Sequence, residues 1–278
     1  MQSRKFISSH IEDLKKKRRK AFKIKVIIFS ILFILLLVGL YFLSKWNQIN
    51  INKVEVVGAK VLDKDKLEAF VYEKIEGKYL YLFPKSNFVI TPRSKIKREL
   101  TSNFRRIETL NFDVSNPETL KIEITERVPV YTWCGEILDL ETKCDFVDKD
   151  GYVFDEAPYF SGDIYFRFYG KLSDYYINQD YFKNLVLFIS NLHRVDLAPV
   201  ALVERENKEL EIYLSSNNLN INSSKIILNY ENDLEKLFQN LKSAVETEPL
   251  KTKIKENYSS LQYLDLRFSN KVYYKFDE

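Results

Sequence analysis

The residues that usually build catalytic and metal centres are scarce in this chain. Its 278 residues include two histidines, two cysteines and one methionine. His10 belongs to the N-terminal tail, which leaves His193 without a second histidine in the rest of the chain. His193 lies at the end of a predicted helix, so we expect it to be an ordinary surface or capping residue. Two cysteines alone do not complete a zinc shell. The sequence also lacks G-x-S-x-G, H-E-x-x-H and a glycine-rich phosphate loop. We therefore predict no enzymatic activity and no cofactor.

Glycine and proline are also scarce, with seven of each, whereas tyrosine and phenylalanine are abundant. This composition favours ordered, β-rich structure over disorder. About 230 residues follow the long apolar run described next, which is enough for one large domain or two of ordinary size.

Charge is absent from Val26 to Ser44, where fifteen of nineteen residues are Val, Ile, Leu or Phe. At about 1.5 Å per residue this run spans roughly the hydrocarbon core of a bilayer. At about 0.3–0.6 kcal/mol per strongly apolar residue, insertion is favourable by about 4–9 kcal/mol. The run is longer than the core of a cleaved signal peptide, and Tyr41 and Trp46 suit a membrane interface. We predict a single, uncleaved transmembrane helix at 26–44.

Residues 1–25 form a basic tail with ten basic and two acidic side chains, a net charge of +8. The whole chain carries +4, so the remaining residues carry −4. Basic residues stay on the cytoplasmic side, which places the N-terminus inside and the residues after 44 outside. The membrane also accounts for the run from Lys15 to Lys20, so we predict no nucleic-acid partner.

The periodicity of the outer part predicts an α+β fold. In the first 75 or so residues we expect the order β-α-α-β-β, with a helix capped by Asp63 and a second capped by Thr91. The expected segments are a strand at 51–57, helices at 63–75 and 91–102, and strands at 107–114 and 119–125. Further on we expect a hairpin at 146–154, helices at 179–192 and 231–245, strands around Ala201 and at 210–214, 225–228, 261–268 and 272–276, and a polar connection at 246–256.

Three motifs follow one another along the outer part. Residues 117–130 read PETLKIEITERVPV, residues 146–154 read FVDKDGYVF and residues 263–268 read YLDLRF. In this order they resemble the bacterial cell-division protein family FtsQ (DivIB). That family has a P-x-T-L strand with an E-R-x-P exit, then a VD-x-x-G-x-V-F hairpin, then an x-x-D-L-R-[FY] strand. The resemblance implies a POTRA domain at 45–127 and a mixed β domain with flanking helices at 128–278.

The same resemblance implies a non-enzymatic scaffold of the divisome in the cytoplasmic membrane at the division septum. Upstream division proteins would bind the POTRA domain, and FtsB, with FtsL through it, would bind the C-terminal edge. Lys271 departs from the small residue expected in the family. A POTRA-type transport or assembly factor and a membrane-anchored cell-wall enzyme are the alternatives.

The last strands of the chain are the candidate binding site. A strand at the edge of a sheet leaves unpaired N–H and C=O groups that can receive another chain's strand. A final core strand whose edge is protected by lysine is an equally good interpretation of the sequence alone. The resemblance favours partner binding instead. The residues that we expect to bind the partner at the C-terminal edge are Asp265, Arg267, Phe268, Asn270, Lys271, Tyr273 and Phe276.

Two further positions have alternative interpretations. Cys134 and Cys144 flank a predicted hairpin outside the membrane, where a disulfide would stabilise by about 3 kcal/mol; two separate buried thiols are the alternative. Asp148 and Asp150 precede Gly151 in a pattern that hints at calcium but lacks the other ligands, so we expect a tight turn.

Overall fold

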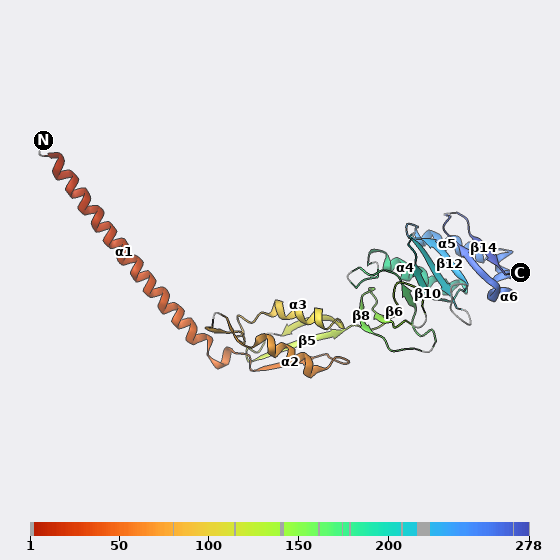
Figure 1. Cartoon of the computed structure of the whole chain (residues 1–278), viewed down its shortest axis with the longest axis horizontal. Helices are drawn as coiled ribbons and strands as arrows, with labels where there is room; N and C mark the ends of the chain where they lie inside the picture. Colours follow the sequence, from red (N-terminus) through yellow and green to blue (C-terminus); the bar gives the residue numbers. More distant parts are fainter. Residues whose placement is uncertain are drawn as a thin grey trace. The chain divides into compact units, whose positions relative to one another are not determined.

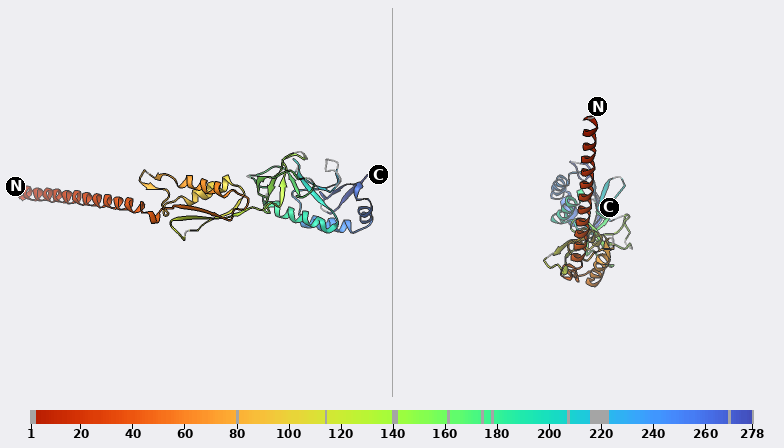
Figure 2. Two further views of the ribbon diagram at one scale, coloured as in Figure 1. Left: turned by 90° about the horizontal axis from the view of Figure 1, so that it is seen from below. Right: turned by 90° about the vertical axis from the view of Figure 1, so that its left-hand side faces the viewer.

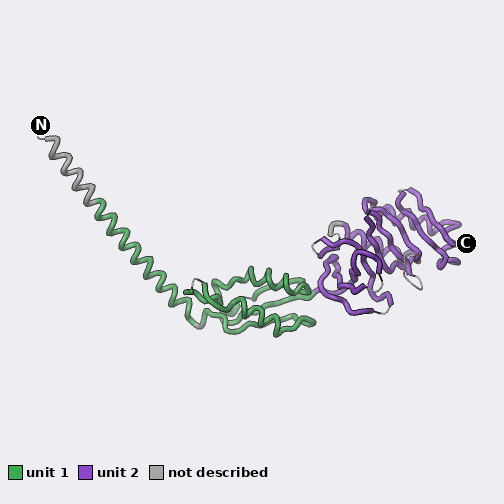
Figure 3. The backbone as a smooth tube through the Cα atoms, in the orientation of Figure 1, with its two compact units in different colours: residues 1–126 green, residues 127–278 purple. Residues whose placement is uncertain are grey.

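The computed structural model describes residues 3–79, 81–113, 115–139, 142–160, 162–173, 175–177, 179–206, 208–215, 223–268 and 270–277. The chain forms two compact units, residues 1–126 and 127–278 (Figures 1 and 3). Both units combine helices with a β-sheet, and an apolar helix lies near the N-terminus. The chain therefore has the α+β character predicted from its sequence.

Unit 1 begins with the long helix α1 (Ser3–Ser44). The part from Arg18 to Ser44 is long and apolar enough to cross a membrane. Its large side chains are exposed all round, as at Phe29 and Leu32, so no other part of the described chain covers them. The helix differs from the prediction in its start, because it continues through the basic tail, whose Lys and Arg residues are good helix formers.

The rest of unit 1 contains two helices and a three-stranded sheet. Its elements are η1 (Asn47–Ile49), β1 (Lys53–Val57), α2 (Lys64–Ile75), β2 (Lys78–Tyr79), β3 (Phe83–Pro84), α3 (Arg93–Asn103), β4 (Ile107–Asp113) and β5 (Thr119–Glu126). The sheet has the order β1-β5-β4, with β1 parallel and β4 antiparallel to β5. The predicted order β-α-α-β-β is therefore present, and the small β2–β3 hairpin lies between the two helices.

One face of this sheet carries the core of unit 1. Val56 lies opposite Ile122 across the β1–β5 pair, and both are buried. Leu67 and Val71 of α2 and Ile96 of α3 belong to the same cluster. Alternate residues of β5 are buried, as the period of two in the sequence predicts.

The starts of the two helices differ from each other. Asp63 caps α2 as predicted, because its Oδ1 accepts hydrogen bonds from the N–H groups of Asp65 (3.0 Å) and Lys66 (3.3 Å). The predicted cap of α3 by Thr91 is wrong. The Thr91 hydroxyl donates instead to the carbonyl of Asn87 (2.8 Å), which closes the preceding turn, and Pro92 occupies the N-cap position.

Unit 2 contains one nine-stranded sheet in the order β14-β13-β12-β11-β10-β9-β6-β7-β8. Its strands are β6 (Tyr131–Trp133), β7 (Asp145–Val147), β8 (Val153–Glu156), β9 (Arg167–Tyr169), β10 (Pro199–Glu204), β11 (Glu209–Leu214), β12 (Lys225–Asn229), β13 (Leu261–Asp265) and β14 (Tyr273–Phe276). Its helices are α4 (Gln179–Leu192), η2 (His193–Val195), α5 (Leu234–Val245), α6 (Leu250–Asn257) and η3 (Tyr258–Ser260). Strand β9 has no counterpart in the sequence-based prediction, whereas β6 pairs with β7 beside the two cysteines that flank a predicted hairpin.

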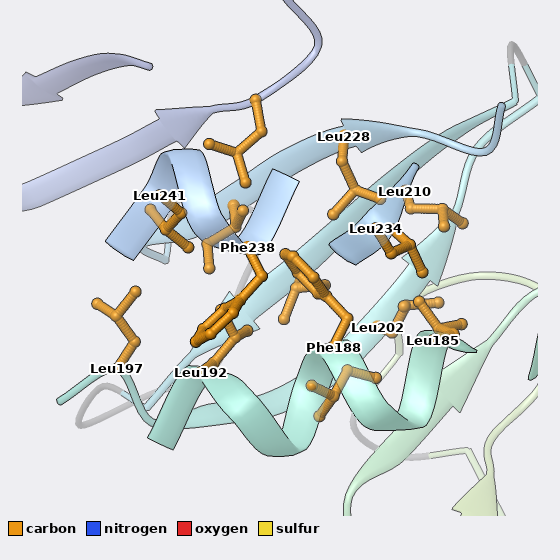
Figure 4. Packing of buried hydrophobic residues seen from close by; sticks show 14 of the residues in the cluster. Leu185, Phe188, Leu192, Leu197, Leu202, Leu210, Leu228, Leu234, Phe238 and Leu241 are labelled. Carbon is orange, nitrogen blue, oxygen red and sulfur yellow. The ribbon is translucent and has the colours of Figure 1, made fainter. Parts of the chain in front are cut away.

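Helices α4 and α5 lie side by side on one face of the sheet (Figure 2). Their apolar stripes meet the sheet in the main core, where Phe188 and Phe238 pack edge to face at 6.4 Å between ring centroids (Figure 4). Leu192, Leu202 and Leu241 lie in the same cluster. The helices predicted at 179–192 and 231–245 are therefore present, and their apolar residues belong to the core.

The prediction of a polar connection at 246–256 is partly wrong, because α6 occupies most of that segment. Leu250 and Ile254 lie one turn apart and are buried, and the side chains between them are exposed. A single apolar pair at this spacing within a Lys-rich segment is enough to attach a short helix to an existing core.

The two cysteines and the Asp148 turn lie in the β6–β8 region. Cys134 and Cys144 form a disulfide across a sequence separation of 10, next to the antiparallel β6–β7 pair. Asp148 Oδ1 accepts hydrogen bonds from the N–H groups of Asp150 and Tyr152, both at 2.9 Å. Its Oδ2 forms an ion pair with Arg127. The carboxylate is therefore used to build a tight turn, as expected.

Candidate partner-binding edge

Strand β14 is the first candidate for a binding surface because it ends the nine-stranded sheet. It pairs antiparallel with β13, with Leu264 opposite Tyr274 and Asp265 opposite Tyr273. Among the described residues, no strand lies on its other side. One row of backbone groups therefore faces outward.

Two hydrogen bonds beside the strands identify the residues of that row. The N–H of Asp277 donates to the carbonyl of Ser260 (2.7 Å), so Asp277 points its backbone groups toward the β13 side. The N–H of Leu266 donates to the carbonyl of Ile227 (2.8 Å), so Leu266 points toward β12. Backbone direction alternates along an antiparallel strand. Both bonds give the same result: Tyr274 and Phe276 direct their N–H and C=O groups away from the sheet.

The side chains of β14 separate into two faces. Tyr274 and Phe276 are half-buried against the main core, and the ammonium of Lys253 in α6 lies 5.8 Å and 5.7 Å from their ring centroids. On the other face Tyr273 is exposed and packs edge to face with exposed Phe268, at 5.2 Å. The edge thus offers a backbone row between two aromatic pairs.

Asp265 and Arg267 form an internal ion pair at the end of β13. The guanidinium donates to Asp265 through Nε (2.9 Å) and Nη2 (2.6 Å), and to Glu209 Oε1 through Nη1 (2.7 Å). The Arg267 N–H also donates to Asp265 Oδ1 (3.0 Å). Burial alone would raise the pKa of Asp265, but the bonds from Arg267 outweigh it and lower that pKa. The same contacts raise the pKa of Arg267.

The predicted site residues therefore have two different positions. Phe268, Asn270, Lys271 and Tyr273 are exposed around the β13–β14 turn, where the Lys271 N–H donates to the Phe268 carbonyl (3.1 Å). Phe276 contributes to the core-facing side of β14. Asp265 and Arg267 bind each other, which makes them supports of the turn and leaves Arg267 half-exposed beside it.

Sequence reasoning missed Lys253, because the segment that contains it was predicted to be irregular. The spacing of Leu250 and Ile254 was the signal for a helix, and Lys253 lies on the exposed part of that helix. The cation lies over two aromatic rings of β14, a geometry that is attractive for a cation and a π face.

The opposite end of the sheet differs from the β14 edge. Strand β8 is the last strand there, but the N–H of Val153 donates to the carbonyl of Tyr175 (2.8 Å). Tyr152 also forms a bridge with Tyr176. These contacts occupy part of that edge, so β14 is the more open of the two.

A scan against protein-family models and a search of curated proteins find no match to this chain. Within the described residues, no group of three or more His, Cys, Asp or Glu side chains is placed to hold a metal ion. The candidate span, the sequence motifs and the open edge are therefore the features of this chain that bear on its function.

Proposed function

We propose that this chain is a single-pass scaffold of bacterial cell division of the FtsQ (DivIB) type. The tail would lie in the cytoplasm and both units outside it. Unit 1 would be a POTRA domain that contacts upstream division proteins, and unit 2 would hold a strand of an FtsB-type protein and, through it, FtsL. The motif set supports this proposal, and so does the order β-α-α-β-β directly after the candidate span.

The open edge of β14 is the observation that carries the proposal. An added strand would reach the N–H and C=O groups of Tyr274 and Phe276. Four such hydrogen bonds, at about 0.5–1.5 kcal/mol each, contribute about 2–6 kcal/mol before the cost of ordering the added strand. The rings of Phe268 and Tyr273 would provide side-chain specificity on the exposed face.

The test compares two substitutions at Tyr274 in the full chain. Tyr274→Ala removes the ring and keeps the outward N–H, whereas Tyr274→Pro removes both. A missing donor leaves the partner's carbonyl unpaired, which costs about 1–3 kcal/mol, or about 5- to 150-fold in Kd. We expect Tyr274→Pro to bind the FtsB-type protein of the same organism more weakly than Tyr274→Ala by at least fivefold, measured with purified proteins in detergent.

The neighbouring residue provides the matched control. Lys275 directs its N–H toward β13, so Lys275→Pro should lower the free energy of unfolding relative to Lys275→Ala. Tyr274→Pro should leave that free energy near the value for Tyr274→Ala, because edge strands tolerate proline where the N–H faces solvent. Equal affinities of the two Tyr274 variants would exclude strand addition at this edge.

Capture of proteins from membrane extract addresses the alternatives. The chain that ends at Phe268 lacks β14 and should lose small, single-pass coiled-coil division proteins that the full chain retains. If neither captures a division protein, transport and cell-wall enzyme functions become the better proposals.

A further inference from the structure

Unit 1 exposes a second group of apolar side chains, in the β2–β3 hairpin and the loop that follows it. Tyr81 is 94% exposed, Val89 77%, Leu82 49% and Ile90 39%. Trp46, just after α1, is 57% exposed. We call these five residues the hairpin surface. Large apolar side chains gathered on one surface of a folded unit mark a binding site for a protein or a membrane.

Hydrogen bonds attach this surface to the end of the candidate membrane span. The amide nitrogen of buried Asn87 donates to the carbonyl of Ser44, the last residue of α1, at 3.3 Å. Asn50 donates to the same carbonyl at 3.1 Å and forms a bridge with Asn87. The N–H of Phe88 donates to the carbonyl of Ile49 at 2.8 Å. The loop is therefore held beside the residue at which the chain leaves α1.

The backbone turns the apolar side chains outward. Tyr81 lies in the turn between β2 and β3 with φ of 62°, a left-handed conformation that favours glycine or asparagine. The chain has an almost fully exposed aromatic residue at this unfavourable position. The N–H of Val89 donates to the Asn87 side chain at 3.1 Å, which fixes the loop with the valine side chain exposed.

The charges near the surface favour an anionic partner. Lys45 and Lys78 are exposed and Lys85 is half-buried. The segment 76–92 contains one acidic residue, Glu76, and two basic residues, Lys78 and Lys85. Tryptophan, tyrosine and lysine side chains beside an apolar helix are typical of the interface between a bilayer and water. Lysine side chains near that interface attract anionic headgroups.

We propose that the hairpin surface inserts into the headgroup layer of the bilayer that α1 crosses, and that it prefers anionic phospholipid. The partner is the membrane itself, because the surface continues directly from the end of the span and combines apolar tips with lysines. This proposal rests on the membrane-spanning role of α1 given above. It is independent of the β14 edge.

The experiment measures the depth of single labels on the full chain in proteoliposomes of phosphatidylcholine and phosphatidylglycerol. Val89→Cys carries an environment-sensitive fluorophore, and a lipid with a nitroxide near the headgroup quenches it. Val61→Cys is the matched control, since Val61 is also a loop valine, 67% exposed, whose N–H is bound by a side chain. Val61 comes after the C-terminal end of β1, whereas Val89 lies two residues after Asn87, which bridges Asn50 before the N-terminal end of that strand. The strand between them rises about 3.3 Å per residue. Both variants keep the native disulfide.

We expect the label at Val89 to be quenched at least threefold more strongly than the label at Val61. Replacing phosphatidylglycerol by phosphatidylcholine should reduce that quenching, and Lys78→Glu combined with Lys85→Glu should reduce it in the anionic vesicles. Unchanged quenching in pure phosphatidylcholine would refute the anionic preference.

A third label, at Leu36→Cys inside α1, separates failure of this proposal from failure of its premise. If Leu36 is quenched by a nitroxide deep in the acyl chains and Val89 is no more quenched than Val61, α1 spans the bilayer and the hairpin surface does not touch it. That result overturns the proposal and implies a protein partner for the surface. If Leu36 is not quenched either, α1 does not span the bilayer and both proposals fail.

Discussion

Replacing Arg267 by methionine tests whether the predicted binding residues at the end of β13 support the fold. The substitution keeps much of the side-chain length and removes three side-chain hydrogen bonds to Asp265 and Glu209. The Asp265 side chain is 8% exposed, so its carboxylate loses a charge partner in a poorly solvated position. Among the described residues, the backbone N–H of residue 267 remains as a donor to this carboxylate (3.0 Å).

The expected loss follows from the exposure of both partners. Removing one partner of a fully buried ion pair costs about 3–5 kcal/mol. The Arg267 side chain is 33% exposed and the backbone bond to Asp265 remains, so we expect a smaller loss in the free energy of unfolding of unit 2, about 2–3 kcal/mol.

The loss should depend on pH with a defined sign. The folded-state pKa of Asp265 is lowered, so its ionisation stabilises the fold above the unfolded value near 3.9 and that contribution is lost as the pH falls through the folded pKa. The parent chain and Arg267→Met should therefore differ most near neutral pH and converge as the pH falls below about 4.

The two tryptophans of the chain make the assay specific to unit 2. Trp46→Phe leaves Trp133 of β6 as the single tryptophan, and urea unfolding of the full chain in detergent is then followed by its fluorescence. Arg194→Met is the control, because Arg194 is an exposed arginine of the same unit and its loss should change the free energy by less than about 0.5 kcal/mol. A loss for Arg267→Met no larger than for Arg194→Met, or one independent of pH, would refute the supporting role.

Two other predictions concern the ends of β5 and of β6. Glu126 accepts hydrogen bonds from the N–H groups of residues 60–62 at 2.8–3.1 Å; burial would raise its pKa, but these bonds lower it. Glu126→Gln should therefore speed amide exchange at 60–62 above about pH 5 and have little effect once the pH has fallen below the folded pKa of Glu126, where the carboxyl is protonated in both states; equal exchange at neutral pH would contradict this. Reduction of the disulfide between Cys134 and Cys144 should lower the free energy of unfolding of unit 2 by about 3 kcal/mol, measured by Trp133 fluorescence with and without reductant; an unchanged midpoint would show that the loop is already ordered in the unfolded chain.

Elements with a strong period were predicted well because their residues decide them locally. The alternation in β5 and the apolar stripe of α5 each need only one face to be buried, and a period of two or 3.6 states that requirement directly. Helix α5 still begins later than predicted, at Leu234, because the Asp233 side chain accepts the N–H groups of Glu235 and Lys236 and so caps the first turn. Short strands such as β9 have no such signal, since three residues cannot display a period.

Local sequence patterns could not predict which groups of the candidate site are free, because that depends on the order of the strands in the sheet. The sequence suggested that the last strand lies at an edge, and the pairing of β14 with β13 agrees with that expectation. Which backbone groups face outward depends on the register between strands that are distant in sequence, such as Leu266 against Ile227. The same register brings Glu209 of β11 to Arg267, a predicted binding residue, and gives its guanidinium a partner within the sheet. A motif can therefore identify the strand, but the contacts of its neighbours decide which of its residues are free to bind.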